Sequence, residues 1–322
     1  WDIVAARPTA NSITLSVLAY RETEGYISYG TESGKYTSGS PKRLLRSGQP
    51  IEILIGGLSP NTNYYYKFCS RPKGVERLDC GSELMFVTAR PAGSDFTFAI
   101  QADSHLDDGV DLATYKRSLT NIADARPDFM IDLGDTFMTD KYPEYKLAQS
   151  QYLAQRYYLG LVSRSIPLFL TIGNHDGEAG WRRGGGDENI FDWSNTNRKM
   201  YFPNPVPNEF YSGNTIRDRK LGDLQDYFSW EWGDALFIVL DPFTFTTSRS
   251  RGDDNWGWTL GKQQYDWLKT TLENSRARYK FVFIHHLVGG SDRVARGGSE
   301  AAQYFEWGGN GPDGREEFTA RR

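Results

Sequence analysis

Several side chains that bind metal ions follow short apolar runs of this 322-residue chain, and these include all four of its histidines. Each run is a candidate strand, and histidines scattered through a core would not be expected to collect at strand ends. Carboxylates, amide oxygens and imidazoles bind borderline to hard divalent ions such as Mn, Fe or Zn, so the pattern predicts a metal site. The residues concerned are Asp103, His105, Asp135, Asn174, His175, Asp176, His285 and His286.

Each piece of this pattern has an ordinary structural explanation when taken alone. Gly134-Asp135 is typical of a turn, Asn174-His175-Asp176 of a helix cap, and His285-His286 of one packed histidine beside an exposed one. Their shared placement and order favour the metal site. More than four candidate ligands indicate two ions with a bridging carboxylate. Such ions, about 3.5–4 Å apart, generate a hydroxide near neutral pH and bind phosphoryl oxygens, which points to hydrolysis of a phosphate ester.

Strand-like and helical segments alternate around these residues, which predicts an α/β fold. The predicted helices span roughly 112–122, 143–163 and 261–275, the first with apolar residues at intervals of three and four. Ligands of open α/β sheets bind beyond the carboxyl ends of the strands, where the candidate residues lie. The Trp-, Asn-, Gly- and Pro-rich segment 177–233 is predicted to be a functional insertion over the site rather than core. The predicted strands are 96–100, 129–133, 168–172, 235–240 and 281–284.

Residues 1–90 are predicted to form an all-β sandwich of their own. Alternating apolar and polar residues recur in short runs, and turn residues separate these runs. The string Leu58-x-Pro60-x-Thr62-x-Tyr64-x-Tyr66 resembles the E–F corner of fibronectin type III domains, where a tyrosine hydroxyl bonds back to the chain. No ionisable cluster accompanies these strands, so a packing or positioning role is favoured over chemistry.

The two cysteines, Cys69 and Cys80, lie eleven positions apart across a polar, turn-like stretch. Paired hairpin strands would bring them close enough for a disulfide, which is favoured over two buried free thiols. A disulfide would indicate an oxidising compartment, so we expect a secreted or periplasmic protein. The chain opens directly into a strand-like sequence, so any signal peptide was removed or never present.

Composition excludes several other classes of protein. With 37 Lys and Arg against 41 Asp and Glu, the chain has no basic excess with which to bind a nucleic-acid duplex. No apolar run approaches the ~18–20 residues that span a bilayer. The balance of 39% hydrophobic and 24% charged residues is that of a globular protein.

The ordered set Asp-x-His, Gly-Asp, Gly-Asn-His-Asp and a histidine at a strand end resembles the calcineurin-like metallophosphoesterase superfamily. The β-sandwich before it resembles the arrangement in purple acid phosphatases. The resemblance implies a layered α/β sandwich with two metal ions of undecided identity (Fe, Mn or Zn). It also implies roles for single residues: Asp103 and His105 on the first metal, Asp135 bridging, Asn174 and His285 on the second, and His175 on the phosphate and leaving oxygen.

Further roles are weaker expectations. Asp176 is a candidate to orient His175, although a turn-forming role is equally open. A packing role is favoured for His286. Arg182 and Arg183 are candidates to bind phosphate, against the alternative of an exposed basic loop.

Two departures from the family pattern matter. Purple enzymes carry a tyrosinate three residues after the bridging Asp, where this chain has Met138, so their ferric assignment is not carried over. The family also has a Gly-His-x-His element, and no histidine follows His286. We expect that the natural chain continues beyond Arg322; a variant with incomplete metal shells is the alternative.

These observations combine into a prediction of a two-domain enzyme. Residues 1–90 form the fibronectin-like sandwich, and 95–322 form a metallophosphoesterase domain with an incomplete C-terminal part. We expect it to hydrolyse phosphorylated small molecules or nucleotides; the choice between monoesters and diesters, and the oligomeric state, are undecided. The alternative is a non-catalytic binding or adhesion protein with a degenerate phosphoesterase fold.

Overall fold

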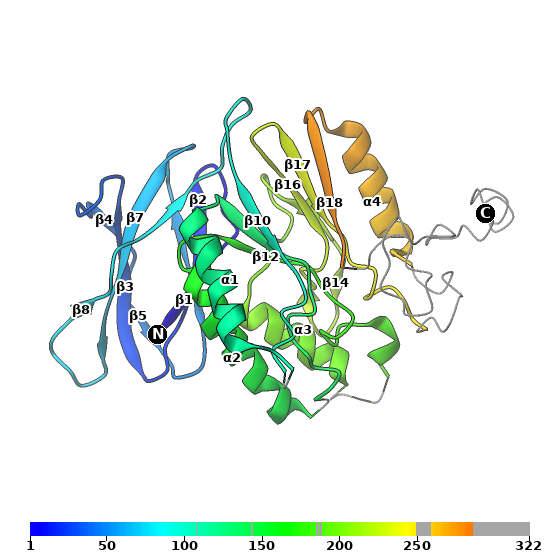
Figure 1. Ribbon diagram of the computed structural model, residues 1–322, viewed down its shortest axis with the longest axis horizontal. Helices are drawn as coiled ribbons and strands as arrows, with labels where there is room; N and C mark the ends of the chain where they lie inside the picture. The colour runs from blue at the N-terminus through cyan, green and yellow to red at the C-terminus, as the bar shows by residue number, and fades with distance from the viewer. Residues whose placement is uncertain (108, 143, 185, 187–188, 249–258, 286–322) are drawn as a thin grey trace, which may run out of the picture.

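The computed structural model describes residues 1–107, 109–142, 144–184, 186, 189–248 and 259–285. A β-sandwich is followed by a layered α/β region, as the sequence predicts (Figure 1). His286 and the rest of 286–322 lie outside the described residues.

The sandwich consists of two antiparallel sheets with an apolar core between them. One sheet contains β1 (Asp2–Ala6), β2 (Ser12–Leu18) and β6 (Ile51–Gly56). Side chains that alternate along the strands meet in one buried cluster, which includes Ile13, Leu15, Tyr66 and Phe68. The other sheet contains β3 (Thr23–Gly30), β4 (Ser38–Gly39), β5 (Arg43–Leu45), β7 (Asn63–Pro72), β8 (Asp79–Cys80) and β9 (Leu84–Val87).

Two local predictions for the sandwich are confirmed. The Tyr64 hydroxyl accepts a hydrogen bond from the backbone N–H of Ser59 at 2.8 Å, the corner contact expected of the tyrosine string. Cys69 and Cys80 face each other across β7 and β8 and form a disulfide.

The α/β region has two sheets packed face to face. The first is parallel and contains β10 (Phe98–Gln101), β11 (Phe129–Asp132) and β12 (Leu168–Leu170). The second contains β13 (Ser212–Gly213), β16 (Phe228–Trp232), β17 (Ala235–Val239) and β18 (Tyr279–Phe283), and β17 and β18 are parallel. A small pair, β14 (Arg217–Asp218) and β15 (Gly222–Asp223), stands apart from these sheets.

Helices cover the outer faces of both sheets, which makes four layers. α1 (Leu112–Ala125) and α2 (Tyr145–Ser163) pack on the first sheet, and α4 (Gly261–Asn274) packs on the second (Figure 1). Within β11 the side chains alternate: Met130 meets the helices, whereas Phe129 and Ile131 enter the aromatic core between the sheets.

The segment 177–233 corrects one sequence prediction. We predicted an insertion over the site, but it also supplies η1 (Gly180–Arg182), α3 (Ile190–Tyr201) and strand β16. The rings of Trp230 and Trp232 are 2% and 0% exposed and pack in the core between the sheets. Its Trp, Asn and Gly content hid the alternation of β16, whose aromatic side chains fill this core.

The sandwich and the α/β region are joined by a shared core. Val4 and Leu18 of the sandwich lie in the same buried cluster as Leu159 of α2. Fully buried Arg156 of α2 donates to the Asp2 carboxylate at 2.5 Å and to the Ser16 carbonyl at 2.5 Å.

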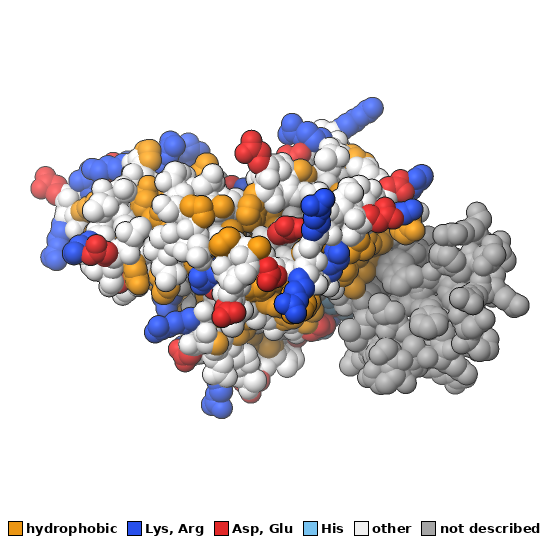
Figure 2. Space-filling view, turned by 90° about the horizontal axis from the view of Figure 1, so that it is seen from above, with side chains coloured by type: hydrophobic (Ala, Val, Ile, Leu, Met, Phe, Trp, Pro, Cys, Tyr) orange, Lys and Arg blue, Asp and Glu red, His pale blue; other side chains and the backbone are white. Residues whose placement is uncertain are grey.

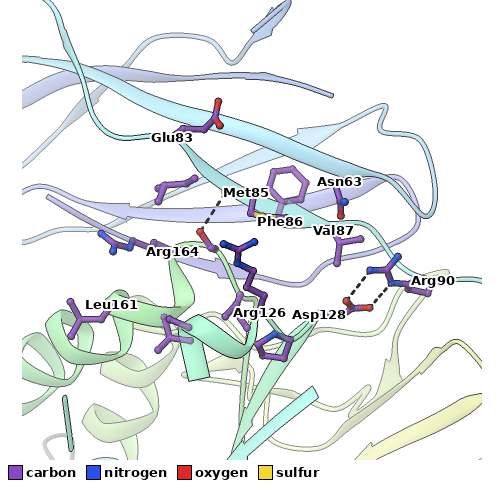
Figure 3. Close-up of a pocket in the computed structure, with 16 residues that line it drawn as sticks. Asn63, Glu83, Met85, Phe86, Val87, Arg90, Arg126, Asp128, Leu161 and Arg164 are labelled. Carbon is purple, nitrogen blue, oxygen red and sulfur yellow. Dashed lines mark hydrogen bonds and ion pairs between the residues drawn. The ribbon is translucent and has the colours of Figure 1, made fainter. Parts of the chain in front are cut away.

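An open cavity of about 440 Å3 lies beside this joint, between β9 and α2 (Figure 3). At its edge Arg90 and Asp128 form a two-pronged ion pair, with distances of 2.6 and 3.0 Å.

The outer surface carries charges of both signs. Figure 2 shows basic and acidic side chains interspersed over one face of the molecule, in keeping with the near-balanced composition. Among the described residues no helix is long and apolar enough to cross a membrane.

Candidate metal centre

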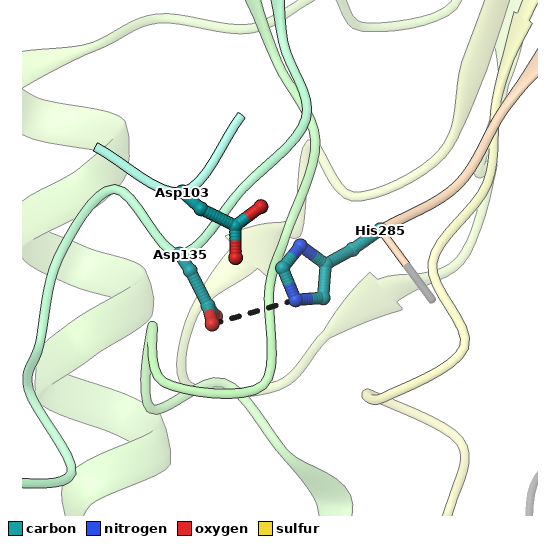
Figure 4. Close-up of side chains that lie close together, drawn as sticks. All are labelled: Asp103, Asp135 and His285. Carbon is teal, nitrogen blue, oxygen red and sulfur yellow. Dashed lines mark ion pairs between the residues drawn. The ribbon is translucent and has the colours of Figure 1, made fainter. Parts of the chain in front are cut away.

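The residues predicted as ligands converge at the carboxyl ends of the strands. Asp103 and His105 follow β10, Asp135 follows β11, Asn174 follows β12, and His285 follows β18. Ligand atoms of Asp103, Asp135 and His285 all lie within 4.8 Å of one another, although these residues come from separate loops (Figure 4).

Close backbone approach between two loops makes this convergence possible. A Cβ on Gly134 would lie 2.5 Å from the backbone nitrogen of Gly173, and a Cβ on Gly173 would lie 2.1 Å from that of Asp135. Only glycine fits at these positions, so the loops after β11 and β12 pack directly together. His175 N–H then donates to Oδ1 of Asp135 at 2.8 Å.

Three of the predicted ligands have strained backbones. Asp103, His105 and Asp135 have φ angles of 53°, 39° and 52°, in the left-handed region that side-chain-bearing residues rarely adopt. Backbone strain of this kind costs on the order of 1–3 kcal/mol per residue and clusters at functional sites. Hydrogen bonds from Asp103 N to Gly134 O and from His105 N to Asp135 O hold the conformation.

His105 directs an unsatisfied nitrogen at carboxylates. Its Nε2 is buried and has no hydrogen-bond partner, yet it lies 3.3 Å from Oδ1 of Asp103 and 3.4 Å from Oδ2 of Asp135. An imidazole nitrogen and carboxylate oxygens converging without a shared hydrogen bond suit a cation between them.

His285 shows the same need for a cation. Its Nδ1 lies 2.9 Å from the Leu133 carbonyl, which can only accept, so Nδ1 carries a proton. Its Nε2 faces Oδ1 of Asn174 at 3.1 Å and Oδ2 of Asp135 at 3.4 Å, both of which are acceptors. Burial lowers the pKa of His285, but the Asp135 hydrogen bond and charge outweigh this and raise it to about 9. The side chains therefore fit a cation at this position, either a proton or a metal ion.

His175 is oriented by a residue that the sequence did not single out. Its Nδ1 lies 2.7 Å from Oδ1 of Asp140, whose other oxygen accepts from Arg182 at 3.3 Å. The Asp140 hydrogen bond raises the pKa of His175, against the opposing effect of burial. Asp140 lies in a loop five residues after Asp135, and no strand end or motif marks it.

Asp176 contacts backbone instead of the His175 ring. Its carboxylate accepts from the N–H groups of Asp135, Phe137 and Gly173 at 3.1, 2.7 and 2.7 Å. Burial, and then the charge of Asp135, raise the pKa of Asp176. Asp176 thus holds the loop that carries Asp135. The role predicted for Asp176, orienting His175, belongs to Asp140 in the structure.

The two candidate phosphate-binding arginines are both paired with carboxylates. Arg182 is paired with Asp140, and Arg183 pairs with Asp218 at 3.2 Å and lies 4.0 Å over the Phe191 ring. Neither lines the cavity that contains the metal ligands. Their role in substrate binding stays a prediction.

A match to a protein family agrees with this geometry. The model of the calcineurin-like phosphoesterase family matches residues 96–309, well over half of the chain. The chain therefore belongs to the calcineurin-like phosphoesterase family, as its strand-end residues indicate.

Individual relatives are more distant. Over 85 residues the chain is 41% identical to "Probable purple acid phosphatase 20" of Arabidopsis thaliana. This match covers 24% of this chain and 18% of that protein. Among solved structures, PhoD superposes with a TM-score of 0.61 at 16% identity, over 87% of this chain and 61% of that one. Purple acid phosphatase PPD1 from yellow lupin (Lupinus luteus) seeds gives 0.59 at 17%, over 87% and 50%. The chain thus spans less than two thirds of each of these proteins, and the structural likeness establishes the fold.

Proposed function

We propose that this chain is a hydrolase of phosphate esters with two metal ions at the centre described above. The observation that carries the proposal is the convergence of lone pairs from separate loops, with His105 Nε2 buried and unsatisfied beside two carboxylates. Membership of the calcineurin-like phosphoesterase family supports the same chemistry.

In this proposal Asp103 and His105 hold one ion, Asn174 and His285 hold the other, and Asp135 bridges them. Fe, Mn and Zn all suit this mixture of carboxylate, amide and imidazole ligands. When bound, the ions supply a hydroxide near neutral pH and neutralise phosphoryl oxygens. Asp135 suits the bridging place because its Oδ2 lies 3.4 Å from both His105 Nε2 and His285 Nε2.

His175 is the proposed proton donor to the leaving oxygen. It lines the cavity that contains the metal ligands, and its ring lies 5.7 Å from that of His105. The Asp140 carboxylate holds the ring through Nδ1 and raises its pKa, which favours the protonated form needed for donation. Asp140 is therefore a positioning residue for His175.

The compartment is also a proposal. The Cys69–Cys80 disulfide supports a secreted or periplasmic protein, because disulfides persist in oxidising compartments.

The test joins metal content to turnover in the same preparation. Metal-depleted protein is titrated with Mn2+, Zn2+ or Fe2+, bound metal is counted by elemental analysis, and hydrolysis of aryl phosphate esters is measured. We expect two ions per chain and turnover that needs them. His175→Gln should lower turnover by about 10²–10⁴-fold while both ions stay bound, because proton donation is lost but no ligand is. A full-length protein that binds no metal and hydrolyses no phosphate ester would contradict the proposal.

A further inference from the structure

Among the described residues, the cavity over the metal ligands is lined by acids and histidines but by no lysine or arginine. It is open and has a volume of about 1090 Å3. Asp107, which is paired with Lys141, and Asp111, which caps α1, add two carboxylates to those of the proposed ligands. Its charged and imidazole residues are Asp103, His105, Asp107, Asp111, Asp135, His175 and His285.

Two described cations near this cavity already have carboxylate partners. Lys141 Nζ pairs with Asp107 at 2.7 Å, and Arg182 pairs with Asp140. The N-terminus of α1, a place where helices commonly bind phosphate, is occupied by the chain itself. Oδ1 of Asp111 accepts from the N–H groups of Ala113 and Thr114 at 2.9 and 3.2 Å.

Among the described residues, the wall at the start of α1 carries no charge apart from this cap. Gly109, Val110, Thr114 and Ser118 line it, and the last two lie one helical turn apart. Thr114 Oγ1 donates to the Asp111 carboxylate, and Ser118 Oγ donates to the Thr114 carbonyl. Such a surface suits an organic substituent better than a phosphoryl oxygen.

We infer that the site selects phosphodiesters over phosphomonoesters, with the second ester group lying along the α1 wall. The inference rests on the proposed function. A monoester dianion presents three terminal oxygens and two negative charges, whereas a diester presents two terminal oxygens and one charge. Metal ions and His175 suffice for two oxygens, but a third would find no arginine among the described lining residues, and the acids beside it, Asp107 and Asp111, already have partners of their own.

The bonds and protons of diester hydrolysis can be accounted for with water and His175. The oxygen of water forms a bond to phosphorus, and the bond from phosphorus to one ester oxygen breaks. His175 gives that oxygen a proton and regains one from solvent, which also takes the proton lost by the water. The products are an alcohol and a phosphomonoester.

The experiment compares kcat/KM for bis(para-nitrophenyl) phosphate and para-nitrophenyl phosphate in the Mn2+-loaded protein at alkaline pH, where the monoester is a dianion. We expect a preference for the diester of about tenfold or more, the equivalent of 1.4 kcal/mol. Calorimetry with phenylphosphonate and its monomethyl ester measures the same preference in binding alone, and the monoanionic ester should bind more tightly.

Paired variants on α1 sharpen the test. Ser118→Arg places a cation in the cavity and should lower the diester preference about fivefold, the effect of a partly exposed ion pair. Thr120→Arg adds the same charge on the same helix outside the cavity lining, and removes the same kind of bond to a backbone carbonyl. It should leave the ratio unchanged.

The possible results separate this inference from the proposed function. Metal binding with hydrolysis of both esters, but a diester preference below tenfold or a monoester preference, overturns the inference alone. An equal effect of Ser118→Arg and Thr120→Arg overturns the assignment of the α1 wall. Absence of both metal and hydrolysis overturns the proposed function, and the inference with it.

Discussion

The β-sandwich and the metal-binding edge are both built from β-strands, but they differ in how well their polar groups and backbone conformations are satisfied. In the sandwich, side chains such as Phe68 and Tyr66 are fully buried in an apolar core, and the Tyr64 hydroxyl has its backbone partner. At the edge, Asp103, His105 and Asp135 have strained backbones, and a buried nitrogen has no partner. Thus the sandwich is built for stability, whereas the edge carries costs that a bound cation can offset.

The largest expected effect comes from Asp135→Asn. We expect activity to fall by about 10³-fold or more, because one carboxylate is proposed to serve both ions and two-metal catalysis depends on them. Elemental analysis should show loss of metal, and circular dichroism should show a folded chain. Asp124→Asn makes the same chemical change on the exposed side of α1 and should leave metal and activity at wild-type levels. Retention of both ions in Asp135→Asn would break the comparison.

A core deletion in the sandwich should act on stability alone. Phe68→Ala removes a ring that is 0% exposed, and we expect the free energy of unfolding to fall by about 3–5 kcal/mol. Urea denaturation measures this loss. In protein that remains folded, kcat with an aryl phosphate should be unchanged; a selective loss of kcat would show that the sandwich reaches the site.

A buried acid that follows β17 should make stability depend on pH. Burial, and then the charge of Asp226, raise the pKa of Asp241 to about 7. The folded state therefore binds this proton more tightly than the unfolded state, so Asp241 costs stability as pH rises from its ordinary pKa toward 7. The free energy of unfolding of Asp241→Asn, measured in urea titrations, should rise relative to that of the wild type by about 1–2 kcal/mol as the pH is raised from about 5 to about 7. A constant difference across this range would contradict the shift, and Asp124→Asn is the exposed control.

The smallest expected effect is that of Tyr64→Phe in the sandwich corner. The backbone N–H of Ser59 loses its acceptor, which should cost about 1 kcal/mol of unfolding free energy. Thermal denaturation should detect it, while bound metal stays at the wild-type level. Tyr65→Phe, on the same strand, is a control for removal of a hydroxyl. If it lowers the unfolding free energy as much as Tyr64→Phe does, the effect does not come from the bond between Tyr64 and Ser59.

Local patterns made much of this fold predictable. The strands β10, β11, β12, β17 and β18 lie within about two residues of their predicted positions, because their apolar runs are short and sharply bounded. The site followed from topology, since residues after parallel strands must meet at one edge. The disulfide and the tyrosine corner followed from local spacing.

Other features depend on contacts that spacing does not encode. Asp140 reaches His175 only because the loop that bears it folds back over the next strand end. Asp176 has its three backbone donors only once the two glycine loops are packed together. The aromatic residues of β16 read as an insertion because their partners, such as Phe169 and Phe237, lie far away in sequence.

The buried Arg156 makes the sandwich and the α/β region difficult to separate. Its guanidinium is satisfied by Asp2 and Ser16, so separating the two parts would leave a charge and several polar groups without partners in an apolar surface. Helix α2 therefore depends on the first strand of the chain, which supplies partners for its buried side chains. Transplanting this sandwich onto another protein, or exchanging it for a foreign one, would require Asp2, Ser16 and the apolar contacts of Val4 and Leu18 to travel with it.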